Sequence, residues 1–199
     1  MSTSTQTRTD PAAGVKQRQS ASASAVASGP TPRKEKESPA SCKAWVATAA
    51  KRPMVLETLD LGPLAAEDVE IAVDHCGLCH SDLSVLNNDW GISQYPAILG
   101  HEVTGRVTAV GPSAKGLKVG QRVGVGWDSG SCMHCRQCMS GSHHLCPQVQ
   151  ATIVGHRGGF ASRIRAHWAW AIPLPEKLSA AEAGPLLCGG ITVFAPLMM

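Results

Sequence analysis

The alternation of apolar and polar residues predicts a mainly β fold with short helices. Residues 69–74 (VEIAVD) alternate in this way, which predicts a strand with one buried face and with Glu70 on the face in water. The stretches 103–111 (VTGRVTAVG) and 121–126 (QRVGVG) are rich in Val and Gly and predict two further strands, separated by the turn-forming residues 115–120 (KGLKVG). Short strands at these intervals favour a β-barrel or a β-sandwich.

One later segment has a helical pattern. Ser179 can cap the start of a short helix within 179–188 (SAAEAGPLLC), and Glu182 three residues later would complete a capping box. Gly184 and Pro185 then end the helix. The segment therefore predicts one short helix after the strands.

The first 41 residues have a different composition from the rest. They consist mainly of Ser, Thr, Ala, Gln and Pro, with only two valines, and cannot bury enough apolar surface to offset chain entropy. We therefore predict that residues 1–41 form a disordered, solvated tail. Their Ser- and Arg-containing, acid-poor start also resembles an organellar transit peptide. The expected location is the cytoplasm, with import into an organelle as the alternative.

Size and charge narrow the classes of function. The 199 residues, 43% of them hydrophobic, suffice for one packed domain with a tail. Residues 1–41 carry six Lys and Arg against three acidic residues, whereas residues 42–199 carry twelve of each. A neutral domain without a basic run is not suited to nucleic acid, and no apolar run approaches the length that spans a bilayer. We therefore expect neither a nucleic acid nor a membrane as a partner.

Four of the eight cysteines lie close together in the stretch CMHCRQCMSGSHHLC. Because no secretory signal follows Met1, we expect a reducing compartment, where thiolates bind metal more often than they pair. Four thiolates with two-residue spacers match a closed tetrahedral zinc site, which has no position left for a substrate. An iron–sulfur cluster is the chemical alternative. The predicted ligands of this structural metal are Cys132, Cys135, Cys138 and Cys146, and the histidines among them are interpreted as bystanders.

A second metal site is predicted from residues far apart in the chain. Cys79 offers a thiolate, His101 an imidazole and Cys188 another thiolate. Three protein ligands with a water completing the tetrahedron leave a position that can take a substrate oxygen, which is typical of catalytic zinc. Cys76 and Cys79 also form a C-x2-C pair, but we interpret Cys76 as a small buried side chain rather than a redox partner.

Several motifs resemble those of one enzyme family. Residues 100–114 (GHEVTGRVTAVGPSA) resemble the zinc signature of the medium-chain alcohol dehydrogenases. Residues 76–84 (CGLCHSDLS) and 183–192 (AGPLLCGGIT) are similar to the cinnamyl-alcohol-dehydrogenase-like branch, and the cysteine cluster matches the structural-zinc lobe of the family. The resemblance covers roughly residues 43–199.

The resemblance implies a domain plan. Residues 42–185 would form a GroES-like, distorted β-barrel catalytic domain with its zinc lobe at 130–147. Residues 186–199 would begin the connection to a Rossmann domain, and no G-x-G-x-x-G sequence is present to supply that domain. We therefore expect the chain to be a catalytic-domain fragment that is inactive alone. The alternative is a non-enzymatic zinc-binding GroES-like module.

The resemblance also implies roles for residues around the catalytic zinc. Cys79, His101 and Cys188 would bind the ion, and Glu102 would lie beside it and could enter its ligand shell. Asp82 would accept a hydrogen bond from the far nitrogen of His101 and so fix its tautomer.

The remaining implied residues concern the cofactor and the substrate. Ser81 would take the proton of the bound alcohol, His80 would lie near the cofactor pyrophosphate and Thr192 near the nicotinamide. Trp90 would line a pocket for a small apolar or aromatic alcohol or aldehyde. The implied reaction is hydride transfer with NAD(P)(H), with NADP(H) expected over NAD(H), and with two Zn²⁺ per chain. An oligomer is expected only in a longer form of the protein.

Overall fold

The computed structural model describes residues 41–198. The predicted tail therefore lies outside the described residues, except for Ser41. This residue is the first of strand β1 (Ser41–Ala47), where it pairs with Asp60. The ordered domain thus includes one residue that the sequence analysis placed in the tail.

The described chain consists mainly of short strands with a few short helices, as predicted. After β1 the strands are β2 (Val55–Asp60), β3 (Asp68–Gly77), β4 (Ala97–Ile98), β5 (Glu102–Val110), β6 (Arg122–Val125), β7 (Asp128–Gly130), β8 (Gln150–Ala151), β9 (Arg163–His167) and β10 (Ile172–Pro173). The α-helices are α1 (His80–Asn87), α2 (Arg136–Met139), α3 (Ala180–Ala183) and α4 (Gly189–Leu197). Three 3-10 helices complete the list: η1 (His143–Leu145), η2 (Trp168–Trp170) and η3 (Gly184–Leu187).

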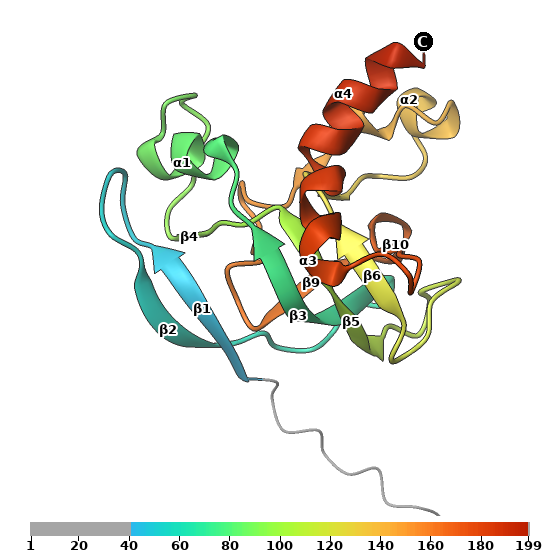
Figure 1. Cartoon of the computed structure of the whole chain (residues 1–199), viewed down its shortest axis with the longest axis horizontal. Helices are drawn as coiled ribbons and strands as arrows, with labels where there is room; N and C mark the ends of the chain where they lie inside the picture. The colour runs from blue at the N-terminus through green and yellow to red at the C-terminus, as the bar shows by residue number, and fades with distance from the viewer. Residues whose placement is uncertain (1–40, 199) are drawn as a thin grey trace, which may run out of the picture. The chain divides into compact units, whose positions relative to one another are not determined.

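The strands form three sheets. The largest has the order β10-β6-β5-β3-β9, a second has the order β2-β1-β4, and β7 pairs with β8. The three strands predicted from the sequence are β3, β5 and β6, which lie side by side in the largest sheet and pair antiparallel (Figure 1). Within residues 41–198 the edge strands β9 and β10 do not pair with each other, so the expected distorted barrel is not closed by hydrogen bonds.

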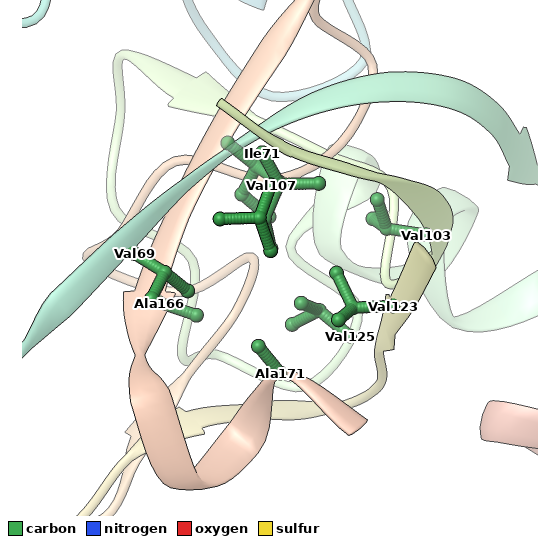
Figure 2. Close-up of a cluster of buried hydrophobic side chains, with 9 residues drawn as sticks. Val69, Ile71, Val103, Val107, Val123, Val125, Ala166 and Ala171 are labelled. Atoms are coloured by element: carbon green, nitrogen blue, oxygen red, sulfur yellow. The ribbon is translucent and has the colours of Figure 1, made fainter. Parts of the chain in front are cut away.

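The core is built from the inward faces of the five-stranded sheet (Figure 2). β-Branched residues dominate it because they pack well on a pleated surface. Its buried side chains are Val69, Ile71, Val103, Val107, Val123, Val125, Ile164, Ala166 and Ala171. This cluster fixes β3 and β5, next to whose ends the predicted metal ligands Cys79 and His101 lie.

The predicted helix within 179–188 is present in two parts. Ser179 occupies the N-cap position of α3, but its side chain makes no capping hydrogen bond. The α-helical part ends at Ala183, and the chain continues as η3, which has a proline in its first turn. The predicted start and the end near Gly184 are therefore confirmed, whereas the side-chain cap is not present.

The prediction that Glu70 faces water is wrong. Glu70 is only 4% exposed, although it lies on β3 where the alternation placed it on the outer face. Its carboxylate oxygens lie 2.6 Å from Nη1 of Arg163 and 2.8 Å from Nη2 of Arg165, both on the neighbouring strand β9. Two guanidinium groups from a distant segment therefore make burial of this carboxylate possible.

The Glu70 ion pairs predict a pH-dependent stability. Burial alone would raise the pKa of Glu70, but hydrogen bonds and charge from Arg165 and Arg163 lower it below its ordinary value. Its contribution is therefore complete above the carboxyl pKa of the unfolded chain, about 4.3, and is lost as the pH falls through the lower folded value. We expect Glu70→Gln to lower the free energy of unfolding by about 1.5–3 kcal/mol at neutral pH, with a smaller difference in acid.

Urea unfolding of both proteins over a pH series measures this difference. Glu57→Gln is a matched control, since Glu57 is exposed on β2, and it should change stability by less than about 0.5 kcal/mol. A Glu70→Gln deficit that did not shrink towards low pH would contradict the role given to the ion pairs.

Among the described residues, no single helix is both long and apolar enough to cross a membrane. Only the pair Ala180–Leu187 and Gly189–Leu197, bent by 54°, meets such a criterion of length and composition.

Candidate functional site

Cys79 lies at the start of α1, where the helix holds it in place. Its backbone N–H donates a hydrogen bond to the Asp82 carboxylate at 3.0 Å, which satisfies one of the open donors of the first turn. Burial raises the pKa of the Cys79 thiol, but hydrogen bonds from the backbone and hydroxyl of Ser81 contribute to a net lowering. The first turn of α1 therefore stabilises a thiolate at Cys79.

His101 is fully buried between β4 and β5 and is oriented by Asp82. The Asp82 carboxylate lies 3.0 Å from Nδ1 of His101 and also accepts the backbone N–H of Gly100 at 2.8 Å. Burial would lower the pKa of His101, but the hydrogen bond and charge of Asp82 raise it above its ordinary value. With Nδ1 donating to Asp82, the lone pair of Nε2 is free for a metal. This is the arrangement expected for Asp82 from the sequence.

Cys188 joins the other two residues from the turn between η3 and α4. Its Sγ lies 3.8 Å from Sγ of Cys79 and 3.2 Å from Nε2 of His101. A carboxylate oxygen of Glu102, which is 6% exposed on β5, belongs to the same group, and all four ligand atoms lie within 4.8 Å of one another. The structure thus brings together four residues that the sequence analysis placed around the catalytic metal, and we call them the Cys79 cluster.

The chemistry of these donors fits a divalent cation. Burial and, to a smaller degree, the neighbouring Cys79 together raise the pKa of the Cys188 thiol to about 12. Two sulfurs this close cannot both ionise easily unless a cation lies between them. Thiolate, imidazole and carboxylate donors around one point are the set that Zn²⁺ prefers.

The second group of sulfurs lies in the lobe between β7 and β8. The Sγ atoms of all four cysteines of the sequence cluster, Cys132, Cys135, Cys138 and Cys146, lie within 4.8 Å of one another. Sγ of Cys132 is 3.6 Å from Sγ of Cys146 and 3.9 Å from Sγ of Cys138. Four sulfurs in this compact arrangement fit one tetrahedral metal with no open position. We call this group the Cys132 cluster.

Backbone donors turn towards the sulfurs of this lobe. N–H groups of Cys135 and Gln148 lie 3.3 Å from Sγ of Cys132 and of Cys146, respectively. Hydrogen bonds from the backbone of His134 and Cys135 contribute to lowering the pKa of the Cys132 thiol to about 6. The loop is therefore folded so that its amides stabilise thiolates, which supports a metal site.

The three histidines of the lobe do not belong to the metal-ligand group found there. His143 instead packs edge-on against Trp170, with ring centroids 5.3 Å apart, and its Nδ1 lies 3.2 Å from the hydroxyl of Ser131. That hydroxyl is also 3.2 Å from Sγ of Cys138. His143 thus connects the lobe to the residues after β9.

The other predicted site residues lie around the Cys79 cluster at the surface. Ser81 is half-buried in the first turn of α1, and His80 is exposed beside it. Thr192 is exposed in the first turn of α4, where its N–H donates to the carbonyl of Cys188. Trp90 follows α1 and is 48% exposed. The roles expected for these four residues stay predictions.

Trp127 is a site residue that the sequence analysis missed. Its ring packs edge-on against the ring of His101, with centroids 5.1 Å apart, and Trp90 packs against Trp127 at 6.1 Å. A row of two tryptophans therefore leads from the Cys79 cluster to the surface. The sequence gives little sign of this role, because Trp127 lies between β6 and β7, away from every recognised motif.

A cavity of about 330 Å³, which neither Trp90 nor Trp127 lines, borders Cys79. Its apolar wall comes from Met54, Leu78, Leu83, Leu86, Leu99 and Phe160, and His80 and Asp82 also line it. The cluster therefore borders two apolar surfaces, one formed by this cavity and one by the tryptophan pair.

Comparisons with known proteins agree with this arrangement. The family model for the alcohol dehydrogenase GroES-like domain matches residues 65–176. Aldehyde reductase AdhA of Synechocystis sp. is 51% identical over 156 residues, which are 78% of this chain and 46% of that relative. A cinnamyl alcohol dehydrogenase structure from Sorghum bicolor has a TM-score of 0.75 at 34% identity, covering 79% of this chain and 47% of that one.

A cinnamyl alcohol dehydrogenase of Helicobacter pylori, solved with NADP(H), also has a TM-score of 0.75, at 28% identity over 79% of this chain and 48% of that one. The chain thus spans less than half the length of these relatives. The family match covers more than half of the chain and confirms the GroES-like fold that the motifs implied. The chain therefore belongs to the alcohol dehydrogenase GroES-like domain family, whose zinc-dependent medium-chain members its motifs resemble.

Proposed function

We propose that this chain is the catalytic part of a zinc-dependent alcohol dehydrogenase or aldehyde reductase that uses NADP(H) and carries two Zn²⁺. The observation that carries the proposal is the convergence of Cys79, His101 and Cys188 from three distant segments, with the buried Asp82 orienting the imidazole. A cluster of this composition has three strong protein ligands and one weaker carboxylate, so it can exchange a ligand for a substrate oxygen. The relatives named as aldehyde reductase and cinnamyl alcohol dehydrogenase support the same reaction.

In this proposal each residue of the site has a defined task. Zn²⁺ held by the Cys79 cluster would supply Lewis-acid polarisation of the alcohol or aldehyde oxygen. Asp82 keeps the proton of His101 on Nδ1, so that Nε2 stays a ligand. Glu102, the carboxylate of the Cys79 cluster, would be the ligand that gives way to the substrate oxygen. Ser81, two residues after Cys79, would accept the hydroxyl proton of the alcohol at Oγ while releasing its own hydroxyl proton to solvent, and the two transfers would run in reverse during aldehyde reduction.

The cofactor would lie across the exposed starts of α1 and α4. NADP(H) would accept or donate the hydride. His80 is exposed at the first position of α1, where its side chain can meet a phosphate, and Thr192 is exposed on α4. The preference for NADP(H) is supported by the NADP(H) complex of the Helicobacter relative.

A chimera with the Synechocystis aldehyde reductase tests the proposed activity. Residues 41–199 would replace the segment that they match in that relative, and the oxidation of NADPH or NADH would be followed with cinnamaldehyde as substrate. We expect aldehyde-dependent turnover, with NADPH preferred, and two zinc ions per chain by elemental analysis. A folded chimera that holds zinc and binds NADPH but reduces no aldehyde would favour the alternative of a non-enzymatic zinc-binding module.

The substrate preference is tested at Trp90. We propose that the apolar part of the substrate lies against Trp90 and Trp127 rather than in the cavity beside Met54. In the chimera, Trp90→Ala should lower kcat/KM for cinnamaldehyde about two- to tenfold, because an aromatic contact contributes about 0.5–1.5 kcal/mol, and should leave kcat/KM for acetaldehyde unaffected. Trp45→Ala is the matched control, since Trp45 is equally exposed (49%) but lies on β1. Equal losses for both aldehydes would exclude Trp90 from the substrate wall.

A further inference from the structure

Cys188 reaches the Cys79 cluster through a segment that lies against the β5–β6 part of the sheet. We call residues 174–188 the return segment, because it leads from β10 back to the metal ligands. It includes α3, which contacts β3 and β5, and η3, which contacts β3, β5 and β6. Neither helix exceeds four residues, so contacts with the sheet rather than helix formation must hold the segment in place.

Arg122 makes the first of these contacts. It is the first residue of β6 and is only 8% exposed. Its Nη2 donates hydrogen bonds to the backbone carbonyls of Pro175 and Leu178. Its backbone carbonyl accepts the N–H of Leu174 at 3.1 Å, and its Nε lies 4.0 Å from the Glu176 carboxylate. One buried guanidinium therefore fastens the beginning of the return segment at several points.

Thr104 and two glycines complete the contact. The Thr104 hydroxyl, buried on β5, donates to the carbonyl of Ala180 at 2.9 Å. Leu187, the residue before Cys188, lies so close to the sheet that a Cβ on Gly124 would stand 2.5 Å from its Cδ1, and a Cβ on Gly126 2.6 Å from its carbonyl oxygen. The position of Cys188 is thus set by how the return segment sits on β6.

We propose that Arg122 is a positioning residue for the Cys79 cluster, acting through the return segment. Cys79 and His101 are held by α1, Asp82 and the sheet, whereas Cys188 lies at the end of the return segment, where α4 begins. Loss of the Arg122 side-chain hydrogen bonds leaves the carbonyls of Pro175 and Leu178 without this donor and loosens the start of the segment, so that Cys188 must be ordered at the moment of metal binding. The inference rests on the metal site of the proposed function, but not on the reaction.

Cobalt binding tests this inference in the 199-residue chain. The metal-free protein would be titrated with Co²⁺, whose thiolate charge-transfer absorption reports each cluster, and compared with Arg122→Met, Arg122→Lys and Arg106→Met. Arg106 is the matched control: it lies opposite Arg122 on β5 and shares Glu176 with it, at 3.8 Å, but is about half exposed and makes no bond to Pro175 or Leu178.

We expect Arg122→Met to weaken Co²⁺ binding at the Cys79 cluster about 10–100-fold and to leave the Cys132 cluster at its wild-type affinity. The Co²⁺ affinity of the Cys79 cluster in Arg122→Lys should lie between those of the wild type and Arg122→Met. Arg106→Met should match the wild type. In the presence of one equivalent of metal per cluster, Cys188 should be alkylated faster in Arg122→Met, while Cys135 stays protected. If Arg122→Met proves insoluble, Arg122→Lys replaces it in the alkylation experiment. Faster alkylation of Cys188 than in the wild type would support the inference, and an unchanged rate would contradict it.

Unchanged cobalt affinity in Arg122→Met would overturn the inference, as would an equal loss at both clusters, which would mean a general effect on folding. Wild-type chain that binds Co²⁺ only at the Cys132 cluster would overturn the inference and the proposed function together. Two cobalt sites with the expected Arg122 effect, in a chimera without aldehyde turnover, would leave the inference standing and contradict the proposed function alone.

Discussion

Cys79→Ser is expected to lower aldehyde turnover by the chimera by about three orders of magnitude while the fold survives. The substitution removes one of the three strong donors of the Cys79 cluster, and Lewis-acid polarisation of a reacting oxygen contributes several kcal/mol to lowering the barrier. The hydrogen bond that places Cys79 at the start of α1 comes from its backbone N–H, so serine keeps it. Turnover, zinc content and thermal unfolding of the variant would be measured together.

Cys76→Ser is the control for this prediction. Cys76 lies three residues earlier, is half-buried, and burial raises the pKa of its thiol to about 12, but it does not belong to the Cys79 cluster. It should keep both zinc ions and most of the turnover. If Cys79→Ser kept wild-type turnover with one zinc fewer, the metal of this cluster would have no part in the reaction.

The parts of the site that lie close in sequence could be predicted from spacing. The Cys132 cluster falls within fifteen residues, and its four cysteines are predicted as ligands from their spacing. The convergence of His101 and Cys188 on Cys79 could not be derived from spacing, because it depends on how the sheet and the return segment fold. Ligand chemistry suggested the three residues as one site, and the resemblance of their surrounding motifs to a family supported that grouping.

The errors and omissions share one physical cause, which is contact between segments far apart in the chain. Alternation placed Glu70 in water because the pattern on β3 cannot show that Arg163 and Arg165 will lie beside it. Trp127 and Arg122 were missed for the same reason. The contact of Trp127 with the His101 ring and the hydrogen bonds of Arg122 to distant backbone carbonyls leave no pattern in the sequence around either residue. The alternation of apolar residues and the local composition predicted the strands. The partners of the polar side chains could be identified only from the structure.

The second large effect is expected at the Cys132 cluster, where Cys135→Ser should destabilise the lobe rather than slow the reaction directly. The lobe between β7 and β8 contains only the four residues of α2 and the three of η1 as regular structure, and Leu145 and Met139 are exposed. With so little apolar burial, metal binding must supply most of its folding energy, and structural zinc contributes about 10–16 kcal/mol in small domains. We expect the variant to hold one zinc instead of two, to be cleaved by protease within the lobe and to give less soluble protein.

His134→Ala provides the contrast for Cys135→Ser within the same loop. His134 is exposed and its ring nitrogen only reaches the carbonyl of Cys132, so its removal should leave both zinc ions and the protease resistance of the lobe in place. The two cysteine variants should then show different defects. Cys79→Ser should keep a protease-resistant lobe and lose turnover, whereas Cys135→Ser should lose the protease resistance of the lobe before it loses turnover. The Cys132 cluster has no donor that can leave without breaking its tetrahedron, and the Cys79 cluster has one in Glu102. If both variants lost turnover and protease resistance to the same degree, this division between a structural and a catalytic metal would be wrong.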